Sequence, residues 1–333
     1  MNSIGSSWLA AHGKLWYDDK WYRLGWITWP QAFAAVALLW FWVTPSTTIK
    51  TAQWAKPIDL AARSRELLTL HDNAKSSQPA MDTLERDALG GESTAQFYYA
   101  TLFDPDLRLS TITAPDVTKS TGWYSRAANQ GNQYAMSNLA IGYASGTYVR
   151  QDFTKACFYA RNLGADAFPA ALRVKGDCFA QGVGGTQVDM PLAASAYEMA
   201  ANKGNIRAIA TLGYFYENGL GGRARSPETA LKYYRSAADR NDALGLHNLG
   251  AAYSSGSLGL QRDPDEAARL IIRALETKYE ITVQSITGRP ELWTSDFWQS
   301  LQRRLAEKGL YTGTIDGRPN PATLESVRRL GRR

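Results

Sequence analysis

A short motif recurs four times at nearly constant spacing and limits the chain to a repeat fold. Each copy has a small residue, an aromatic residue three positions later and a glycine three positions after that. The closing glycines are 36, 37 and 37 residues apart, and they are Gly146, Gly182, Gly219 and Gly256. A period between about 20 and 50 residues is typical of a solenoid, in which each repeat packs only against its neighbours.

The motif predicts that each repeat is a helical hairpin. The small residue lets a neighbouring helix approach closely, and the aromatic residue lies on the same helical face, where we expect it to fill the core. The glycine can adopt the left-handed conformation that ends a helix, and a second helix then follows. The small and aromatic residues are, copy by copy, Ala140 and Tyr143, Gly176 and Phe179, Gly213 and Tyr216, and Gly250 and Tyr253.

These residues resemble the Sel1-like repeat family, relatives of the tetratricopeptide repeats, over residues 93–278. A first unit, with Ala100 and Phe103, lacks the closing glycine and carries an insertion from Asp104 to Pro115. Terminal repeats of a solenoid are often atypical because they cap the stack. The resemblance implies an all-α, superhelical adaptor that binds other proteins.

The same resemblance assigns the docking surface to the concave face of the first helices. The candidate partner-binding residues on this face are Asn138, Tyr214, His247 and Asn248. His247 and Asn248 have an alternative role, because they would equally contact the next hairpin. For the motif aromatics and alanines, core packing is favoured over any ligand contact.

Residues 27–43 contain no charged residue and are close to the minimum length of a membrane-spanning helix, about 17 residues. Pro30 suits the first helical turn, and Pro45 would stop the helix. We therefore predict one transmembrane helix, kept as an uncleaved signal anchor. The alternatives are a buried helix of a soluble protein and a cleaved signal peptide, although no Ala-x-Ala cleavage site follows Val43. Tryptophans, which favour the headgroup layer, flank the segment at Trp26, Trp29, Trp40, Trp42 and Trp54.

The segments beside this predicted span carry positive charges on both sides, so charge alone does not choose the orientation. Residues 1–26 are either an interfacial helix or a disordered cytoplasmic tail. Residues 44–92 read as a linker with capping helices, one within 57–72 and one within 81–89.

Four short motifs define a carboxy-terminal region, residues 296–333. The region resembles the small three-helix peptidoglycan-binding domain, which a linker over 279–295 would join to the repeats. The resemblance implies contacts to sugar or peptide from Tyr311, Asp316, Arg318 and Asn320. Asn320 stands where the family usually has glycine, and a structural end-cap on the solenoid is the alternative. The motifs are Leu301-Gln302-x-x-Leu305, Gly309-x-Tyr311-x-Gly313, Asp316-Gly317 and Thr323-x-x-x-Val327.

Peptidoglycan lies outside the inner membrane, so this second resemblance implies a bacterial inner-membrane protein whose carboxy-terminal body is periplasmic. The net charge of +6 is concentrated near the carboxy terminus. Such a charge attracts anionic envelope polymers. Nucleic acid, the usual rival partner of a basic tail, is disfavoured because of the predicted span and the wall-binding motifs.

The chain has two cysteines, Cys157 and Cys178. Cys157 falls on the second helix of one predicted hairpin, and Cys178 falls on the first helix of the next. These helices are neighbours in a stacked repeat, and an oxidising periplasm would permit a disulfide between them. The alternative is a pair of buried thiols that pack as small apolar side chains.

No catalytic constellation accompanies these features. The histidines, His12, His71 and His247, have no metal-binding spacing, and no glycine-rich loop matches a phosphate-binding pattern. The sequence therefore predicts a non-enzymatic, membrane-anchored periplasmic scaffold without cofactor or metal, which binds an envelope protein and tethers to peptidoglycan. The alternative is a regulatory subunit of an envelope enzyme or of a polysaccharide or secretion machine, and a hydrolase is disfavoured.

Overall fold

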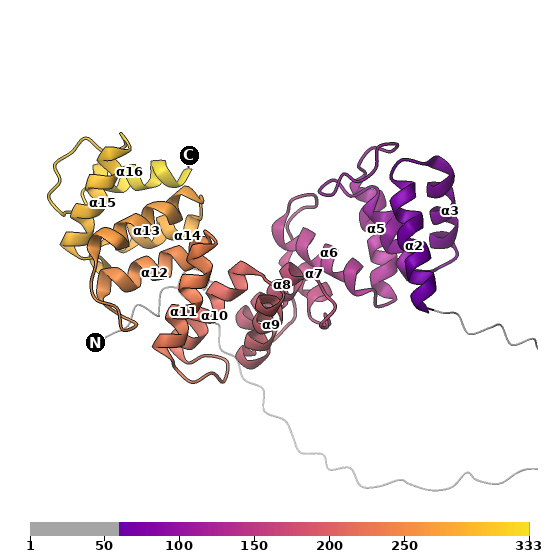
Figure 1. The fold of residues 1–333 in the computed structure, drawn as a ribbon, viewed down its shortest axis with the longest axis horizontal. Helices are drawn as coiled ribbons and strands as arrows, with labels where there is room; N and C mark the ends of the chain where they lie inside the picture. Colours follow the sequence, from indigo (N-terminus) through magenta and orange to yellow (C-terminus); the bar gives the residue numbers. More distant parts are fainter. Residues whose placement is uncertain (1–59, 333) are drawn as a thin grey trace, which may run out of the picture. The chain divides into compact units, whose positions relative to one another are not determined.

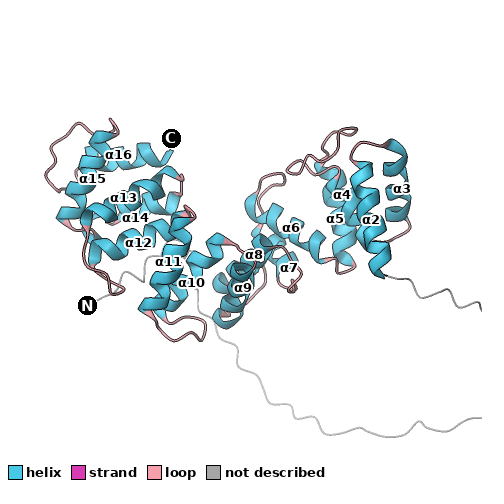
Figure 2. Cartoon of the chain, in the orientation of Figure 1, coloured by secondary structure: helices cyan, strands magenta, loops and turns pink. Residues whose placement is uncertain are grey.

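The computed structural model describes residues 60–332. From Ser64 onward these residues form one compact unit of helices and loops without a strand (Figure 1, Figure 2). The predicted tail over 1–26 and the predicted transmembrane helix over 27–43 lie outside the described residues. Within residues 60–332, no helix is both long enough and apolar enough to cross a membrane.

Stacked helical hairpins make up most of the described chain, as the motif predicts. Helices α2 (Leu60–Ala74) and α3 (Gln78–Leu89) precede the repeats and correspond to the predicted capping helices. The hairpins are α4 (Ser93–Thr101) with α5 (Val117–Asn129), α6 (Gln133–Ser145) with α7 (Phe153–Ala160), α8 (Pro169–Gln181) with α9 (Met190–Asn202), α10 (Ile206–Asn218) with α11 (Pro227–Asp239), and α12 (Ala243–Ser255) with α13 (Pro264–Glu276). Three helices and one 3₁₀ turn follow: α14 (Glu280–Gly288), η2 (Pro290–Leu292), α15 (Ser295–Glu307) and α16 (Pro321–Arg332).

The closing glycines of the motif end the first helices as predicted. Gly146, Gly182, Gly219 and Gly256 have φ angles between 65° and 71°, in the left-handed region. In these copies, the amide of the residue that caps the second helix donates to the carbonyl oxygen of the motif aromatic, at 2.8 to 2.9 Å. Local hydrogen bonds therefore fix each hairpin. The caps of the second helices, whose side chains accept an amide three positions on, are Asp116, Asp152, Asp189, Ser226 and Asp263.

The motif aromatics do not fill the core, so this prediction is wrong. They are half-buried, and the buried rings beside the small residues come from the second helices. A Cβ atom on Gly176 would lie 2.5 Å from the Tyr197 ring, and one on Gly213 would lie 2.6 Å from the Tyr234 ring. Three residues turn an α-helix by about 300°, so the motif aromatic lies about 60° from the small residue, at the edge of the buried face.

The carboxy-terminal region is continuous with the last repeat. The predicted linker over 279–295 contains α14 and η2, and the predicted domain over 296–333 contains the two helices α15 and α16. The helices α14, α15 and α16 share one apolar core with α13, because the last hairpin has no following repeat to cover its face. The structure thus has the arrangement of the end-cap alternative. Buried residues of this core include Ile271, Leu275, Val283, Ile286, Phe297, Leu301, Leu305, Val327 and Leu330.

Candidate functional site

Four positions in each repeat bring side chains of the first helix to one surface. They lie six, three and two positions before the small residue of the motif and one position after it. At 3.6 residues per turn, they fall within an arc of about 100° that lies away from the small residue. We call this surface the first-helix face. The predicted partner-binding residues Asn138, Tyr214, His247 and Asn248 all occupy these positions.

In the first repeats, a row of aromatic rings runs along the first-helix face and ends at Phe168, the residue before α8. The ring centroid of Phe97 lies 5.4 Å from that of Tyr98 and 5.6 Å from that of Tyr134. The ring centroids of Tyr134 and Phe168 are 5.3 Å apart. His71 of α2 stacks on Tyr98 at 4.8 Å. Tyr134 is 44% exposed, whereas Tyr98 and Phe168 are half-buried. We call Tyr98, Phe97, Tyr134 and Phe168 the aromatic row.

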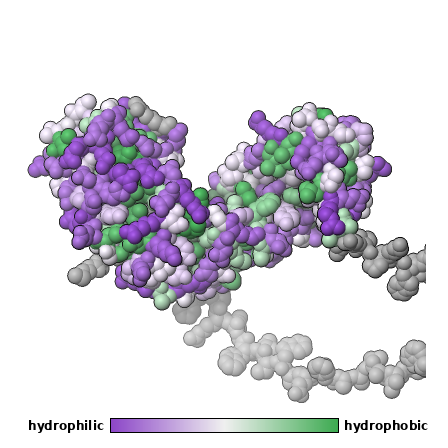
Figure 3. Space-filling view, in the orientation of Figure 1, coloured by the Kyte–Doolittle hydropathy of each residue, from purple (hydrophilic) through white to green (hydrophobic). Residues whose placement is uncertain are grey.

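Large apolar side chains are also exposed elsewhere, but singly. Phe153 and Phe158 of α7 are 53% and 52% exposed, and the guanidinium of Arg161 lies 4.9 Å from the ring centroid of Phe158. Figure 3 shows apolar side chains on the visible face as separate patches among hydrophilic ones. Scattered apolar residues are normal on protein surfaces, so they do not define a site.

Two of the predicted contact residues, Asn138 and Tyr214, are half-buried, so part of each side chain reaches the surface. The carbonyl oxygen of Asn138 accepts the Tyr148 hydroxyl at 2.9 Å, and that of Tyr214 accepts Nδ2 of Asn218 at 2.9 Å. Burial raises the pKa of the Tyr214 hydroxyl. Both residues belong to the first-helix face, but only a small part of each side chain is exposed.

Beyond the aromatic row, the first-helix face carries two arginines with acidic partners. Arg173 forms an ion pair with Asp177, whose carboxylate also accepts the Tyr197 hydroxyl at 2.9 Å. Burial raises the pKa of Asp177, and the charge of Arg173 opposes this shift. Arg207 donates through Nε to the carboxylate of Asp242 at 2.8 Å. Residues 60–332 contain no group of three or more His, Cys, Asp or Glu that could hold a metal ion.

In the last repeats, aromatic side chains from the predicted linker cover the first-helix face. The guanidinium of Arg207 lies 4.3 Å from the ring centroid of Tyr279, and the His247 ring lies 6.0 Å from that of Trp293 in an edge-on arrangement. Burial lowers the pKa of His247 to about 4. His247 therefore contacts the segment that follows the repeats, and Asn248 beside it keeps a buried amide nitrogen. Both side chains are half-buried, and the His247 ring lies against Trp293 of the predicted linker.

The predicted glycan-binding residues form one hydrogen-bonded loop. Tyr311 is buried, and its hydroxyl donates to the carbonyl oxygen of Thr314 at 2.8 Å and accepts Nδ2 of Asn320 at 3.1 Å. The Asn320 side chain also accepts the amide of Thr323 at the start of α16. Asp316 and Arg318 are exposed, and a hydrogen bond from the backbone amide of Arg318 lowers the pKa of Asp316. The burial of Tyr311 argues against its predicted sugar contact, since its hydroxyl supports the loop.

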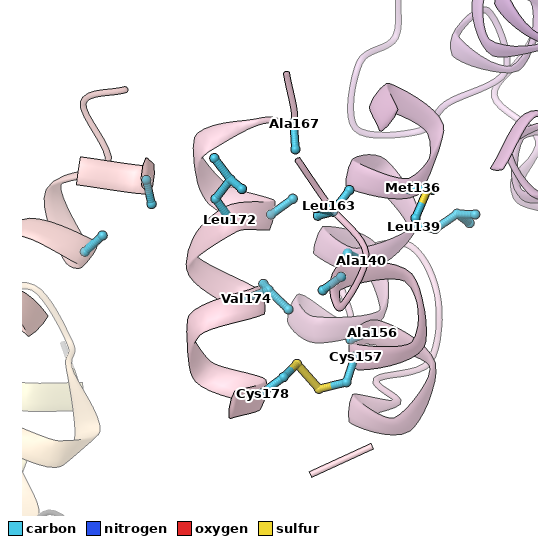
Figure 4. Close-up of a cluster of buried hydrophobic side chains, with 14 of the residues drawn as sticks. Met136, Leu139, Ala140, Ala156, Cys157, Leu163, Ala167, Leu172, Val174 and Cys178 are labelled. Atoms are coloured by element: carbon cyan, nitrogen blue, oxygen red, sulfur yellow. A yellow bond between two sulfur atoms is a disulfide. The ribbon is translucent and has the colours of Figure 1, made fainter. Parts of the chain in front are cut away.

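A disulfide joins the two cysteines. Figure 4 shows the bond between Cys157 of α7 and Cys178 of α8, beside the apolar side chains of Ala156 and Val174. Both cysteines are buried, and their Cα atoms are 5.7 Å apart. The bond connects the second helix of one hairpin to the first helix of the next.

The repeat family follows from comparison with known proteins. Five segments match the model of the Sel1 repeat and together cover more than half of the chain: residues 93–132, 133–162, 171–205, 206–242 and 243–276. The chain belongs to the Sel1 repeat family. Members of this family typically mediate protein–protein interactions. No curated protein matches the sequence.

A solved structure of a Sel1 repeat protein has a similar fold, and two further solved structures match with lower TM-scores. A Sel1 repeat protein from Oxalobacter formigenes is 24% identical, with a TM-score of 0.51 over 74% of this chain and 98% of its own. The c5321 protective antigen of uropathogenic Escherichia coli is 21% identical, with a TM-score of 0.38 over 76% and 64% of the two chains. Immunity protein Pa5087 of Pseudomonas aeruginosa is 19% identical, with a TM-score of 0.34 over 73% and 84%.

The Sel1 matches leave out residues 163–170, and the structure shows an irregular joint there. Helix α7 has 8 residues, whereas the second helices of the other Sel1 repeats have 13. Side chains replace the missing helical hydrogen bonds: Gln133 accepts the amide of Gly164 at 2.7 Å, and Ser137 accepts the amide of Phe168 at 3.1 Å. The disulfide joins α7 and α8, the two helices that flank this joint, at the end of α8 that lies away from it (Figure 4).

Sequence reasoning missed the aromatic row and the residues that cover the last Sel1 repeats. One signal was present in the sequence. The position six residues before the small residue holds Tyr134 in the second repeat and Arg207 in the fourth. Such large, unlike side chains at one solvent-facing position indicate a surface whose chemistry changes along the solenoid. The covering residues Tyr279 and Trp293 carried no signal, because they lie beyond the repeats.

Proposed function

We propose that this chain is a non-enzymatic, membrane-anchored periplasmic scaffold that binds a partner protein through the first-helix face of its Sel1 repeats. The observation that carries the proposal is the aromatic row on the first-helix face, in which Tyr134 is 44% exposed. Aromatic side chains are enriched at the centres of protein interfaces, since they bury a large area at a small cost in side-chain entropy.

The periplasmic location has two supports. The disulfide between Cys157 and Cys178 suits an oxidising compartment, since glutathione keeps such pairs reduced in the cytosol. The uncharged segment over 27–43 has the length of a single-pass anchor. A carboxy-terminal body in the periplasm satisfies both.

Tethering to peptidoglycan is the second part of the proposal. Its support in the structure is limited to the exposed side chains of Asp316 and Arg318, because Tyr311 and Asn320 are engaged within the loop. A pull-down with purified cell-wall sacculi tests this part. Retention that a double replacement, Asp316→Ala with Arg318→Ala, abolishes would support tethering, and passage of the intact protein through the sacculi would reject it.

Partner binding is tested by photo-cross-linking in cells. A photoreactive amino acid at Asn138, on the first-helix face, is compared with one at Lys232, which is exposed on the second helix α11. We expect a discrete adduct from position 138 and none from position 232. Equal labelling at both positions, or none at either, would contradict partner binding through this face.

Location is tested by adding protease to intact spheroplasts. Digestion of the repeats before lysis is the expected result. Protection until lysis would indicate a cytoplasmic adaptor. The alternative role, a regulatory subunit of an envelope enzyme, is distinguished by whether the cross-linked partner changes its reaction rate when the chain is deleted.

A further inference from the structure

We propose that the aromatic row binds a short segment of the partner that is rich in arginine or lysine. This inference rests on the proposed function and adds the chemical nature of the partner. It follows from how the same face is used at the two ends of the solenoid, from the cations missing over the row, and from the charge beside it.

Equivalent repeat positions hold complementary side chains at the two ends. Tyr134 lies six residues before the small residue of its repeat, as Arg207 does, and Phe97 lies three residues before, as His247 does. At the covered end, the Arg207 cation lies over the Tyr279 ring, and the neutral His247 ring lies edge-on to Trp293. At the open end the solenoid itself presents the rings. An occupant that fits the same face there must supply the cation.

No cation of residues 60–332 occupies the row. Lysine or arginine lies over an aromatic ring at several other places, for example Arg126 over Trp123 at 4.3 Å and Lys155 over Tyr143 at 5.1 Å. Within residues 60–332, no such contact involves any ring of the aromatic row. Phe97 is buried and His71 stacks on Tyr98, so Tyr134 is the ring of the row most accessible to a cation from outside. Arginine pairs with aromatic faces more often than lysine does.

Acidic side chains lie beside both ends of the row. Asp72 lies close enough to the Tyr98 hydroxyl for its charge to act on it, but its carboxylate already pairs with Lys75 at 2.7 Å. Asp166, two residues before Phe168, is exposed and forms no ion pair within the described residues. A basic segment that extends along the row would find the unpaired carboxylate of Asp166 at the Phe168 end. At this end the charge beside the row is complementary to arginine and lysine.

The test selects peptides against the full-length protein in detergent. A phage library of random short peptides is enriched on the wild type, and the selected peptides are measured by fluorescence polarisation. Three variants are compared: Tyr134→Ala, which removes the exposed ring; Tyr134→Phe, which keeps the ring; and Phe158→Ala, which removes a similarly exposed ring from α7 in the same repeat.

We expect the selected peptides to be enriched in arginine and lysine. Tyr134→Ala should weaken their binding about tenfold, while Tyr134→Phe and Phe158→Ala should bind like the wild type. Replacing the arginines of a peptide by glutamine should have the same effect as Tyr134→Ala, and the remaining binding should no longer depend strongly on salt.

The inference is wrong if the library yields no binding peptide, or if the selected peptides are acidic or uncharged. It is also wrong if Tyr134→Ala and Phe158→Ala bind alike. Cross-linking at position 138 separates these failures from a failure of the proposed function. A partner adduct at position 138, together with any of these contrary results, would support the proposed scaffold function. It would reject the proposal that the partner segment is basic.

Discussion

The first and last repeats of this solenoid are built from the same hairpin but leave the first-helix face in different states. In the first repeats, the face carries the aromatic row, with Tyr134 44% exposed. In the last repeats, Tyr279 and Trp293 cover the face at Arg207 and His247. The difference arises outside the repeats, since the segment that follows α13 supplies the cover. A repeat unit thus specifies the hairpin, and its neighbours in the chain decide whether its surface can bind.

Replacing one aromatic ring at each end should give the largest contrast in stability. Phe297 is completely buried in the core under the covered end and stacks on Trp293 at 4.3 Å. We expect Phe297→Ala to lower the free energy of unfolding by about 3–5 kcal/mol, because it leaves a cavity. Tyr134→Ala at the open end should change it by less than about 1 kcal/mol. Urea denaturation measures both, and a similar loss at the two positions would show that the aromatic row is part of the core.

The disulfide should contribute the next largest effect. It closes a loop with a sequence separation of 21 residues, which contains the irregular joint. In the chain-entropy model, reduction should lower the free energy of unfolding by about 3 kcal/mol. The check is denaturation with and without dithiothreitol, alongside the double variant Cys157→Ala with Cys178→Ala. Dithiothreitol should not affect the double variant, and an unchanged wild type in reductant would contradict the prediction.

Acid should destabilise both ends of the solenoid, through His71 beside the aromatic row and through His247 at the covered end. Burial lowers the pKa of both His71 and His247 to about 4, with the charge of Lys75 adding to the shift at His71. The folded state binds fewer protons than the unfolded state, whose histidines titrate near 6.5. Stability from each neutral histidine is therefore full above pH 6.5 and is lost as the pH falls from 6.5 towards 4, by about 2 kcal/mol each.

Single variants separate the two histidines. His247→Gln should remove the acid sensitivity of the covered end, while the sensitivity due to His71 in the first region remains. Amide hydrogen exchange at pH 7 and pH 5 locates each effect along the chain. An equal response of the His247→Gln variant and the wild type near Trp293 would show that His247 does not titrate with unfolding.

The hairpins could be predicted from the sequence because their signals are local. Gly146 and its equivalents mark helix ends through a backbone conformation that few other residues adopt, and the structure has these ends where the spacing indicates. The motif aromatics were misassigned because a separation of three residues is close to one turn but not equal to it. The contact between Tyr134 and Phe168 depends on how consecutive hairpins pack, and the motif alone does not contain this information.

The carboxy-terminal cover was missed for a different reason. Residues 279–295 were predicted to be a linker, in which Gly288 and Pro290 indicate a turn. The turn is real, but it follows the 9-residue helix α14, whose apolar residues Val283 and Ile286 are buried only because α13 has no further repeat beside it. A sequence resemblance to an independent domain does not show whether that domain packs on its neighbour.

The smallest predicted effect concerns the contact that covers Arg207. Replacing Tyr279 by leucine keeps an apolar side chain over the first-helix face but removes the aromatic ring. Since a partly exposed cation–π contact is worth about 0.5–1 kcal/mol, the free energy of unfolding should fall by no more than this amount. Arg207 keeps its hydrogen bond to Asp242, so the solenoid beneath should not change. Amide exchange should accelerate in α14 and remain unchanged in α10. Exchange in α14 that stays as slow as in the wild type would contradict the prediction. It would show that burial of Val283 and Ile286 is enough to hold the carboxy-terminal segment on the first-helix face, without the contact between Arg207 and the Tyr279 ring.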